Sequence, residues 1–142
     1  MNYVADTLIK TRKLIIRSDT WCQGAYEIHK PKSSINYCLS TKRCLTGAIA
    51  AAMNYPASFI GRGDMIDDII EHVSHSIRAQ VNCNEKIDKF TIANNIDKLA
   101  NMDYLLAYND YSSHKEVIEV LDHAIDMANK IGRAIALEAV AE

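Results

Sequence analysis

The fold is decided by Ser113-His-Lys-Glu-Val-Ile-Glu-Val-Leu121, which opens the longest helical pattern of the chain. Ser113 and Glu116 stand three residues apart, the spacing of a capping box, in which each side chain satisfies a backbone N–H at the start of a helix. Apolar residues then recur at alternating spacings of four and three: Val117, Leu121, Ala124, Ala128, Ile131 and Ile135. This period predicts one long amphipathic helix over residues 114–139.

The same helical spacing recurs upstream of this segment. It predicts helices over residues 2–17, 41–54, 64–81 and 86–107, the last of them split near Asn101. Apolar and polar residues alternate on both sides of Pro31, which predicts a small β-hairpin over residues 25–39. Two strands are only marginally stable alone, so the hairpin would have to lie on the helices. We therefore expect a mainly α, compact domain of about five helices, spanning residues 1–142, with this hairpin.

Composition narrows the class of protein. The chain has 142 residues, a net charge of −2 and 49% apolar residues, which is ordinary for a single globular domain. No apolar run reaches the ~18 residues of a membrane span, and the first residues lack the pattern of a signal peptide. The best candidate for a basic stripe, Lys10, Arg12, Lys13 and Arg17, is a weak group on the first predicted helix. We therefore expect no membrane partner, and nucleic acid is an unlikely one, because such binders carry a broader basic surface.

The cysteines point to a reducing compartment. They are Cys22, Cys38, Cys44 and Cys83, and no two of them form a Cys-x-x-Cys pair. A zinc site of four cysteines needs tighter pairing than this. We expect reduced thiols and a cytoplasmic location.

Three short motifs interrupt the helical patterns. They are Trp21-Cys-Gln-Gly-Ala-Tyr26, Cys44-Leu-Thr-Gly-Ala-Ile49 and Tyr108-Asn-Asp-Tyr111, the last followed directly by the capping box. Each lies where a helix begins or a loop turns, and such positions often share a site or a packing seam. We therefore expect Trp21, Cys44, Asn109 and His114 to surround one cleft.

The order of these motifs resembles an uncharacterised bacterial and phage family, domain of unknown function 6197. The resemblance spans about residues 8–128 and is carried by Trp21, Gln23, Gly24, Ala25, Tyr26, Cys44, Leu45, Gly47, Ala48, Ile49, Asn109, Asp110, His114, Glu116 and Val117. The chain departs from the family pattern in a long insert-like stretch, residues 55–90. The resemblance implies a shared fold unit and supplies no activity.

The motifs allow two kinds of site. Trp21, Gln23 and Tyr26 could line a ligand site around Gly24, with Cys44, Asn109, Asp110 and His114 completing it. The structural alternative is that Trp21 fills the gap between the first helix and the hairpin.

The other kind of site is catalytic. In it Cys44 is a nucleophile, His114 its base, and Asn109 or Asp110 orients the imidazole. At the start of a helix, the helix dipole would lower the pKa of the Cys44 thiol. The structural alternative places Cys44 in a stripe of small residues, with Gly47, Ala48 and Ala51, that lets another helix approach closely.

Two further groups have metal-ligating side chains at helical spacing: Asp68, His72 and His75, and Glu119, His123 and Asp126. The first group lies opposite the apolar stripe of its helix, and the Glu-x-x-His pattern of helical metal sites is missing. We expect both groups to be solvated helix faces, and we expect no metal or other cofactor.

The run Ile131–Ala141 contains only two charges, Arg133 and Glu138. A helix that is apolar on nearly all sides is buried or shared with a partner, so we expect a homodimer or larger assembly.

Taken together, these features predict a non-enzymatic binding protein for a small polar ligand, such as a nucleotide signal, or for a protein partner. A phage accessory role against a host defence protein fits this by analogy. The alternatives are a cysteine-dependent hydrolase or transferase using Cys44 and His114, and a structural oligomerising protein.

Overall fold

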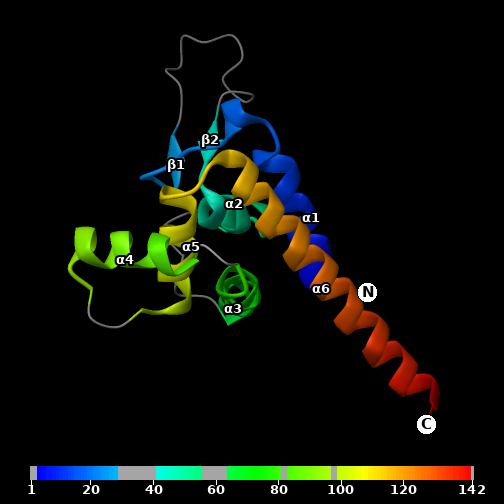
Figure 1. The fold of residues 1–142 in the computed structure, drawn as a ribbon. Helices are drawn as coiled ribbons and strands as arrows, with labels where there is room; N and C mark the ends of the chain where they lie inside the picture. Colours follow the sequence, from blue (N-terminus) through cyan, green and yellow to red (C-terminus); the bar gives the residue numbers. More distant parts are fainter. Residues whose placement is uncertain (1–2, 29–40, 56–63, 81–82, 97–98, 142) are drawn as a thin grey trace.

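Six α-helices and two short strands form the part of the chain that the computed structural model describes, residues 3–28, 41–55, 64–80, 83–96 and 99–141 (Figure 1). The helices are α1 (Tyr3–Ile15), α2 (Leu45–Ala52), α3 (Asp64–Arg78), α4 (Cys83–Asn94), α5 (Asn101–Asp110) and α6 (His114–Ala141). A short 3-10 turn, η1 (Ser18–Thr20), follows α1. The expected mainly α fold with a small hairpin is confirmed.

Helix α2 is the centre of the molecule. Its residues are apolar or small, and the first six of them, Leu45 to Ala50, are buried. Helices α1, α3 and α5 all pack against it. Small side chains let the backbones of neighbouring helices come close, so a helix of only eight residues can be surrounded on several sides.

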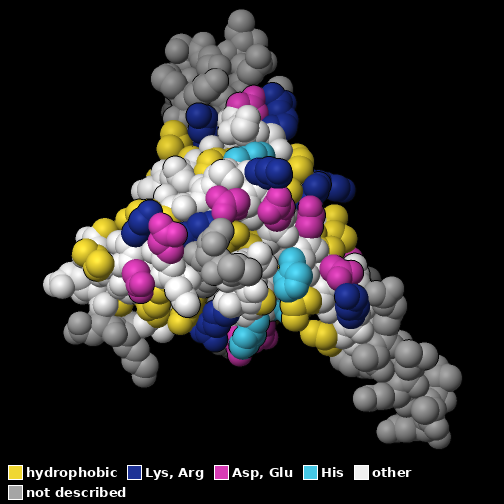
Figure 2. Space-filling model, in the orientation of Figure 1, with side chains coloured by type: hydrophobic (Ala, Val, Ile, Leu, Met, Phe, Trp, Pro, Cys, Tyr) yellow, Lys and Arg dark blue, Asp and Glu magenta, His cyan; other side chains and the backbone are white. Residues whose placement is uncertain are grey.

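Helices α1, α3 and α5 and the first part of α6 bury apolar side chains in the core. Helix α1 packs against α6 as well as α2, and α3 packs against α5 and α6. The largest fully buried side chains of these helices are Leu8, Ile15, Ile66, Ile69, Val73, Ile77, Leu105, Val117, Val120 and Leu121. On the surface, Arg12 Nε lies 2.6 Å from Asp122 Oδ1 and joins α1 to α6. Acidic and basic side chains are interspersed over the face shown in Figure 2, without a basic stripe on that face.

The predicted split of residues 86–107 is confirmed. Helix α4 ends at Asn94, and Asn95 adopts a left-handed conformation with φ 53°, a common way for a helix to end. Helix α5 then starts behind Ala100, whose N–H donates to Asp103 Oδ2 at 2.8 Å. Helix α4 packs against α5 and stands out from the rest of the ribbon (Figure 1).

The hairpin is shorter than expected and pairs differently. Strand β1 (Glu27–Ile28) runs antiparallel to β2 (Lys42–Arg43), with Glu27 opposite Arg43 and Ile28 opposite Lys42. The expected second strand, residues 35–39, lies outside the described residues. The expected helix start at residue 41 is wrong, because Arg43 also bridges to Trp21 and its carbonyl accepts from Cys22 N at 3.1 Å. Residues 42–43 are thus extended.

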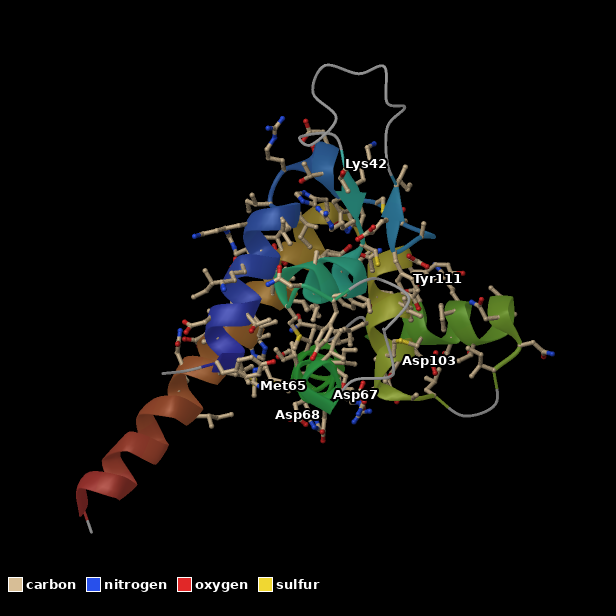
Figure 3. The ribbon with its side chains drawn as sticks, turned by 180° about the vertical axis from the view of Figure 1, so that it is seen from behind. Lys42, Met65, Asp67, Asp68, Asp103 and Tyr111 are labelled. Carbon is tan, nitrogen blue, oxygen red and sulfur yellow. The ribbon has the colours of Figure 1, made fainter. Side chains whose placement is uncertain are left out.

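Helix α6 carries the predicted capping box and is the longest element. Ser113 N donates to Glu116 Oε1 at 2.9 Å, and Glu116 N donates to Ser113 Oγ at 3.2 Å. Its last turns run clear of the other helices in both ribbon views (Figures 1 and 3). Even so, none of the helices in the described parts of the chain is long and apolar enough to cross a membrane.

Candidate functional site

The three sequence motifs meet where the ends of several elements come together. Trp21 follows η1, Cys44 precedes α2, and Asn109 and Asp110 close α5 just before His114 opens α6. We call this region the motif junction and define it as residues 21–26, 44–47 and 109–114. The motifs therefore converge, as expected from the sequence. The expectation that Trp21, Cys44, Asn109 and His114 surround one cleft is wrong, because only Cys44 of the four lines the pocket beside the motif junction.

Asn109 is the hub of the motif junction. Its side chain is fully buried, and Oδ1 accepts from Trp21 Nε1 at 2.7 Å and from Leu45 N at 3.0 Å. Its Nδ2 donates to Cys22 O at 3.0 Å and to Asp110 Oδ1 at 3.2 Å. These four bonds use the whole donor and acceptor capacity of an amide. Asn109 therefore holds three chain segments together and has no polar group left over for a ligand.

Gln23 closes the C-terminal end of α5. Its Nε2 lies 3.0 Å from the carbonyl oxygen of Asn109, 3.1 Å from that of Asp110 and 2.9 Å from that of Ser112, so its two hydrogens are shared among the three carbonyls. The last carbonyls of a helix lack hydrogen-bond donors within the helix, and the Gln23 amide donates to them. The next residue, Gly24, donates its N–H to Asp110 Oδ1 at 3.0 Å in a left-handed conformation with φ 77°. Glycine adopts this conformation without strain.

His114 fastens the motif junction to α1. Its ring lies 5.4 Å from the Trp21 ring, tilted by 48°, and its Nε2 lies 2.6 Å from Ile15 O. A carbonyl only accepts hydrogen bonds, so this nitrogen carries the proton. The same bond satisfies a carbonyl at the end of α1. The proton on Nε2 leaves only Nδ1 of a neutral ring to act as a base.

Cys44 serves as the N-cap of α2. Its Sγ accepts from Gly47 N at 3.3 Å, and the residue is 1% exposed. Burial raises the pKa of the Cys44 thiol to about 11, and the N–H groups of Gly47 and Thr46 offset this only in part. Desolvation therefore outweighs the helix start, contrary to the lowered pKa expected from the sequence. The contacts of Cys44 and His114 lead to different partners, Gly47 for the thiol and Trp21 and Ile15 for the imidazole.

A pocket of about 300 Å³ opens beside the motif junction. It is lined by Gly24, Ala25, Tyr26, Cys44, Phe90, Asn94, Leu106 and Asp110. Of the predicted ligand residues, Tyr26, Cys44 and Asp110 line this pocket. Trp21, Gln23, Asn109 and His114 are not among its lining residues, and their contacts place them in the framework that holds its walls.

Sequence reasoning missed the wall that α4 and α5 supply. Phe90 and Asn94 lie one helical turn apart on α4, and Leu106 lies on α5. None of them belongs to a motif. The only sequence signal was their helical spacing, which places residues four apart on one face without saying what that face meets.

Helix α4 is held in place by Lys86, another residue of the same face. Lys86 is 8% exposed, its Nζ lies 2.6 Å from Glu116 Oε2, and it sits 4.4 Å from the centre of the Tyr108 ring. The hydrogen bond from Lys86, together with one from Ser113 N, lowers the pKa of Glu116. The capping box of α6 thus also positions the pocket wall on α4.

The residues considered as metal ligands do not form such a site. His72 was expected on a solvated face, but it is half-buried and its Nε2 lies 2.9 Å from Ala124 O, so it links α3 to α6. Asp68 and His75 are exposed, as expected. Within the described ranges, no three His, Cys, Asp or Glu side chains gather closely enough to hold a metal ion.

Comparison with known proteins gives a family without an assigned activity. The model of a family of unknown function, DUF6197, matches residues 1–127, which include all three motifs. No curated protein matches the chain. No solved structure matches it either. The long match places the motif junction and the pocket within the family's own region, and the chain belongs to the DUF6197 family of unknown function.

Proposed function

We propose that this protein is a non-enzymatic binding protein that holds a small polar ligand in the pocket beside the motif junction. The observation that carries the proposal is the pocket of about 300 Å³, whose walls come from the loop after Trp21, the start of α2, α4 and α5. Its lining combines apolar side chains with a few polar groups, Asp110, Asn94 and Tyr26 among them. Sites for small molecules usually have this make-up, and this volume is at the lower end of their range.

The framework behind the pocket supports a binding role. Asn109 and Gln23 satisfy the backbone groups that surround them, so the loop carrying Gly24 and Tyr26 is fixed before any ligand arrives. A site that is ordered in advance loses less conformational entropy on binding. The phage accessory role and the cytoplasmic location stay predictions that rest on the family resemblance and the cysteine pattern.

The enzyme alternative is less well supported by the same geometry. Cys44 lines the pocket, but a nucleophilic cysteine needs a lowered pKa, and burial raises the pKa of this thiol to about 11. Its Sγ is also used as a helix cap by Gly47 N. The buried, protonated thiol fits a structural role at the pocket wall.

Cys44 is expected to resist alkylation in the folded protein. With a pKa of about 11, only about one thiol in ten thousand is a thiolate at pH 7, and the side chain is buried as well. Iodoacetamide treatment followed by peptide mass mapping should show slow modification of Cys44 in buffer and fast modification in urea. Cys44→Ser should keep the melting temperature and the ligand affinity, because Ser is also a good N-cap. Fast alkylation of Cys44 in the folded protein would instead favour the hypothesis of a cysteine-dependent enzyme.

A thermal-shift screen of nucleotides, amines, sugars and organic acids tests the binding role. A ligand that binds only the folded state raises its stability by mass action. Ala25→Phe places a ring at the exposed edge of the pocket, and Ala79→Phe places the same ring at the exposed residue just after α3 as a control. A hit should be lost in Ala25→Phe and kept in Ala79→Phe. Hits that survive both variants, or no hit in any class, contradict the proposal.

Self-association is a second candidate function, and the course of α6 favours it. The stripe of α6 that is buried against the body, including Leu121, Ala124 and Ala128, continues to Ile131, which is 50% exposed. The last turns of α6 run clear of the other helices (Figure 3). The sequence of this free part is apolar except for Arg133 and Glu138. Such a surface is a typical protein contact, and a second copy of the chain in two-fold pairing is the commonest partner.

Ile135→Asp is expected to shift the protein from dimer to monomer. The change puts a charge into the apolar run of α6, where it would be desolvated by a partner helix. Native mass spectrometry and light scattering at micromolar concentration measure the shift. Asn129→Asp is the control, since it adds the same charge at an exposed position of the same helix. A wild-type protein that is monomeric at every concentration contradicts this candidate.

A further inference from the structure

We infer that the ligand of this pocket is a small organic cation, an ammonium or guanidinium group on a compact apolar body. The inference rests on the proposed function and names the chemistry of the ligand. The lining residues include one carboxylate, Asp110, and no Lys or Arg. The two hydrogen bonds that the described residues make to this carboxylate, from Gly24 N and Asn109 Nδ2, both end on Oδ1. Oδ2 receives no hydrogen bond from the described residues, which leaves this oxygen to accept from a ligand.

The helix ends around the pocket offer nothing to an anion. Asp110 is the last residue of α5, and the carbonyls at this helix end already accept from Gln23 Nε2, so the negative charge of the pocket comes from the Asp110 carboxylate. The positive end of α2 is engaged within the protein, because Leu45 N donates to Asn109 Oδ1 and Gly47 N donates to Cys44 Sγ. A phosphate or carboxylate would therefore meet a carboxylate without the free N–H groups that helix starts offer to anions.

Lys86, which lies one helical turn before Phe90 on α4, does not reverse this balance. Lys86 forms an ion pair with Glu116 of α6 and lies over the Tyr108 ring, so its positive charge is already paired with a carboxylate. The pocket is therefore a poor match for a nucleotide, whose phosphates require cations or free backbone amides.

Aromatic walls suit an organic cation in particular. Phe90, which is 6% exposed, and Tyr26 both line the pocket. The face of an aromatic ring attracts ammonium and guanidinium groups, and it also packs against an apolar body. Burial raises the pKa of Tyr26, so its phenol stays protonated and neutral. Leu106 and Ala25 complete an apolar surface for the body of the ligand.

The test uses three probes of one shape and different charge: 2-phenylethylamine, 2-phenylethanol and phenylacetate. Calorimetry and thermal shift at pH 7 and low salt measure their affinities for the full chain. The amine is expected to bind about tenfold more tightly than the alcohol, the smallest gain expected from a charge-assisted hydrogen bond, and the acid should not bind. Added salt should weaken the amine and leave the alcohol unchanged.

Two variants test whether the Asp110 carboxylate causes the preference for the amine. Asp110→Asn removes the charge and keeps an acceptor for Gly24 N, so the folded protein should lose the preference for the amine. Asp88→Asn makes the same charge change at an exposed position of α4 and should keep it. Equal affinities for the three probes, tighter binding of the acid, or binding by none of them overturns the inference. If the metabolite screen yields a neutral or anionic hit that Ala25→Phe abolishes, the binding function stands and only the cation class is wrong.

Discussion

Asn109→Ala is expected to lower the free energy of unfolding by roughly 3–6 kcal/mol, since each buried polar group left without a partner costs about 1–3 kcal/mol. The substitution leaves the indole N–H of Trp21, the amide of Leu45 and the carbonyl of Cys22 unpaired. Asn109 is fully buried, so water cannot replace the lost amide without entering the core. A loss of this size is a large part of the ~5–15 kcal/mol that stabilises an ordinary domain.

Urea unfolding followed by circular dichroism measures this loss. Asn129→Ala, an exposed position of α6, is the matched control and should change stability by no more than about 0.5 kcal/mol. Trp21→Phe removes only the indole N–H from the hub and should cost less than Asn109→Ala. If Asn109→Ala behaves like Asn129→Ala, the motif junction does not hold the fold together.

The helices could be predicted because their signals are local. The apolar period of α6 and the Ser113–Glu116 capping box are both confirmed. The start of α2 was predicted at the wrong residue because the segments that determine it lie far away in the sequence. Lys42 and Arg43 are extended since they pair with β1 and with Trp21, and no pattern within residues 40–44 reveals that pairing.

The site was predictable in its location and not in its roles. The order of the motifs indicated that Trp21, Cys44, Asn109 and His114 converge, and hydrogen bonds and ring contacts join them into one region. The raised pKa of Cys44 depends on burial by other elements, which a sequence does not display. Phe90 lines the pocket because α4 packs on α5, so its role could be identified only from the structure.

Gly47→Ala is expected to destabilise the protein by about 3 kcal/mol or more, the upper end of overpacking costs. A Cβ at this position would lie 2.1 Å from Tyr26 O and 2.9 Å from Tyr26 C. Both are backbone atoms that cannot rotate away. The same carbonyl accepts from Cys44 N at 3.2 Å, so moving it would disturb the cap of α2, the start of β1 and the pocket wall at Tyr26 together.

The expected sign of the stability change distinguishes the steric contact at Gly47 from an ordinary effect of helix propensity. Gly47 lies inside α2, where replacing glycine with alanine normally stabilises a helix by about 0.5–1 kcal/mol. Contact with the Tyr26 backbone predicts the opposite sign. Gly24→Ala is the control from the neighbouring motif: its Cβ would meet nothing within 4 Å, so only its left-handed φ of 77° is strained, at about 1–2 kcal/mol. Thermal and urea unfolding of the two variants should therefore rank Gly47→Ala well below Gly24→Ala. A Gly47→Ala protein more stable than the wild type would mean that the Tyr26 backbone does not rest on α2, and the pocket wall built on that contact would have to be abandoned with it.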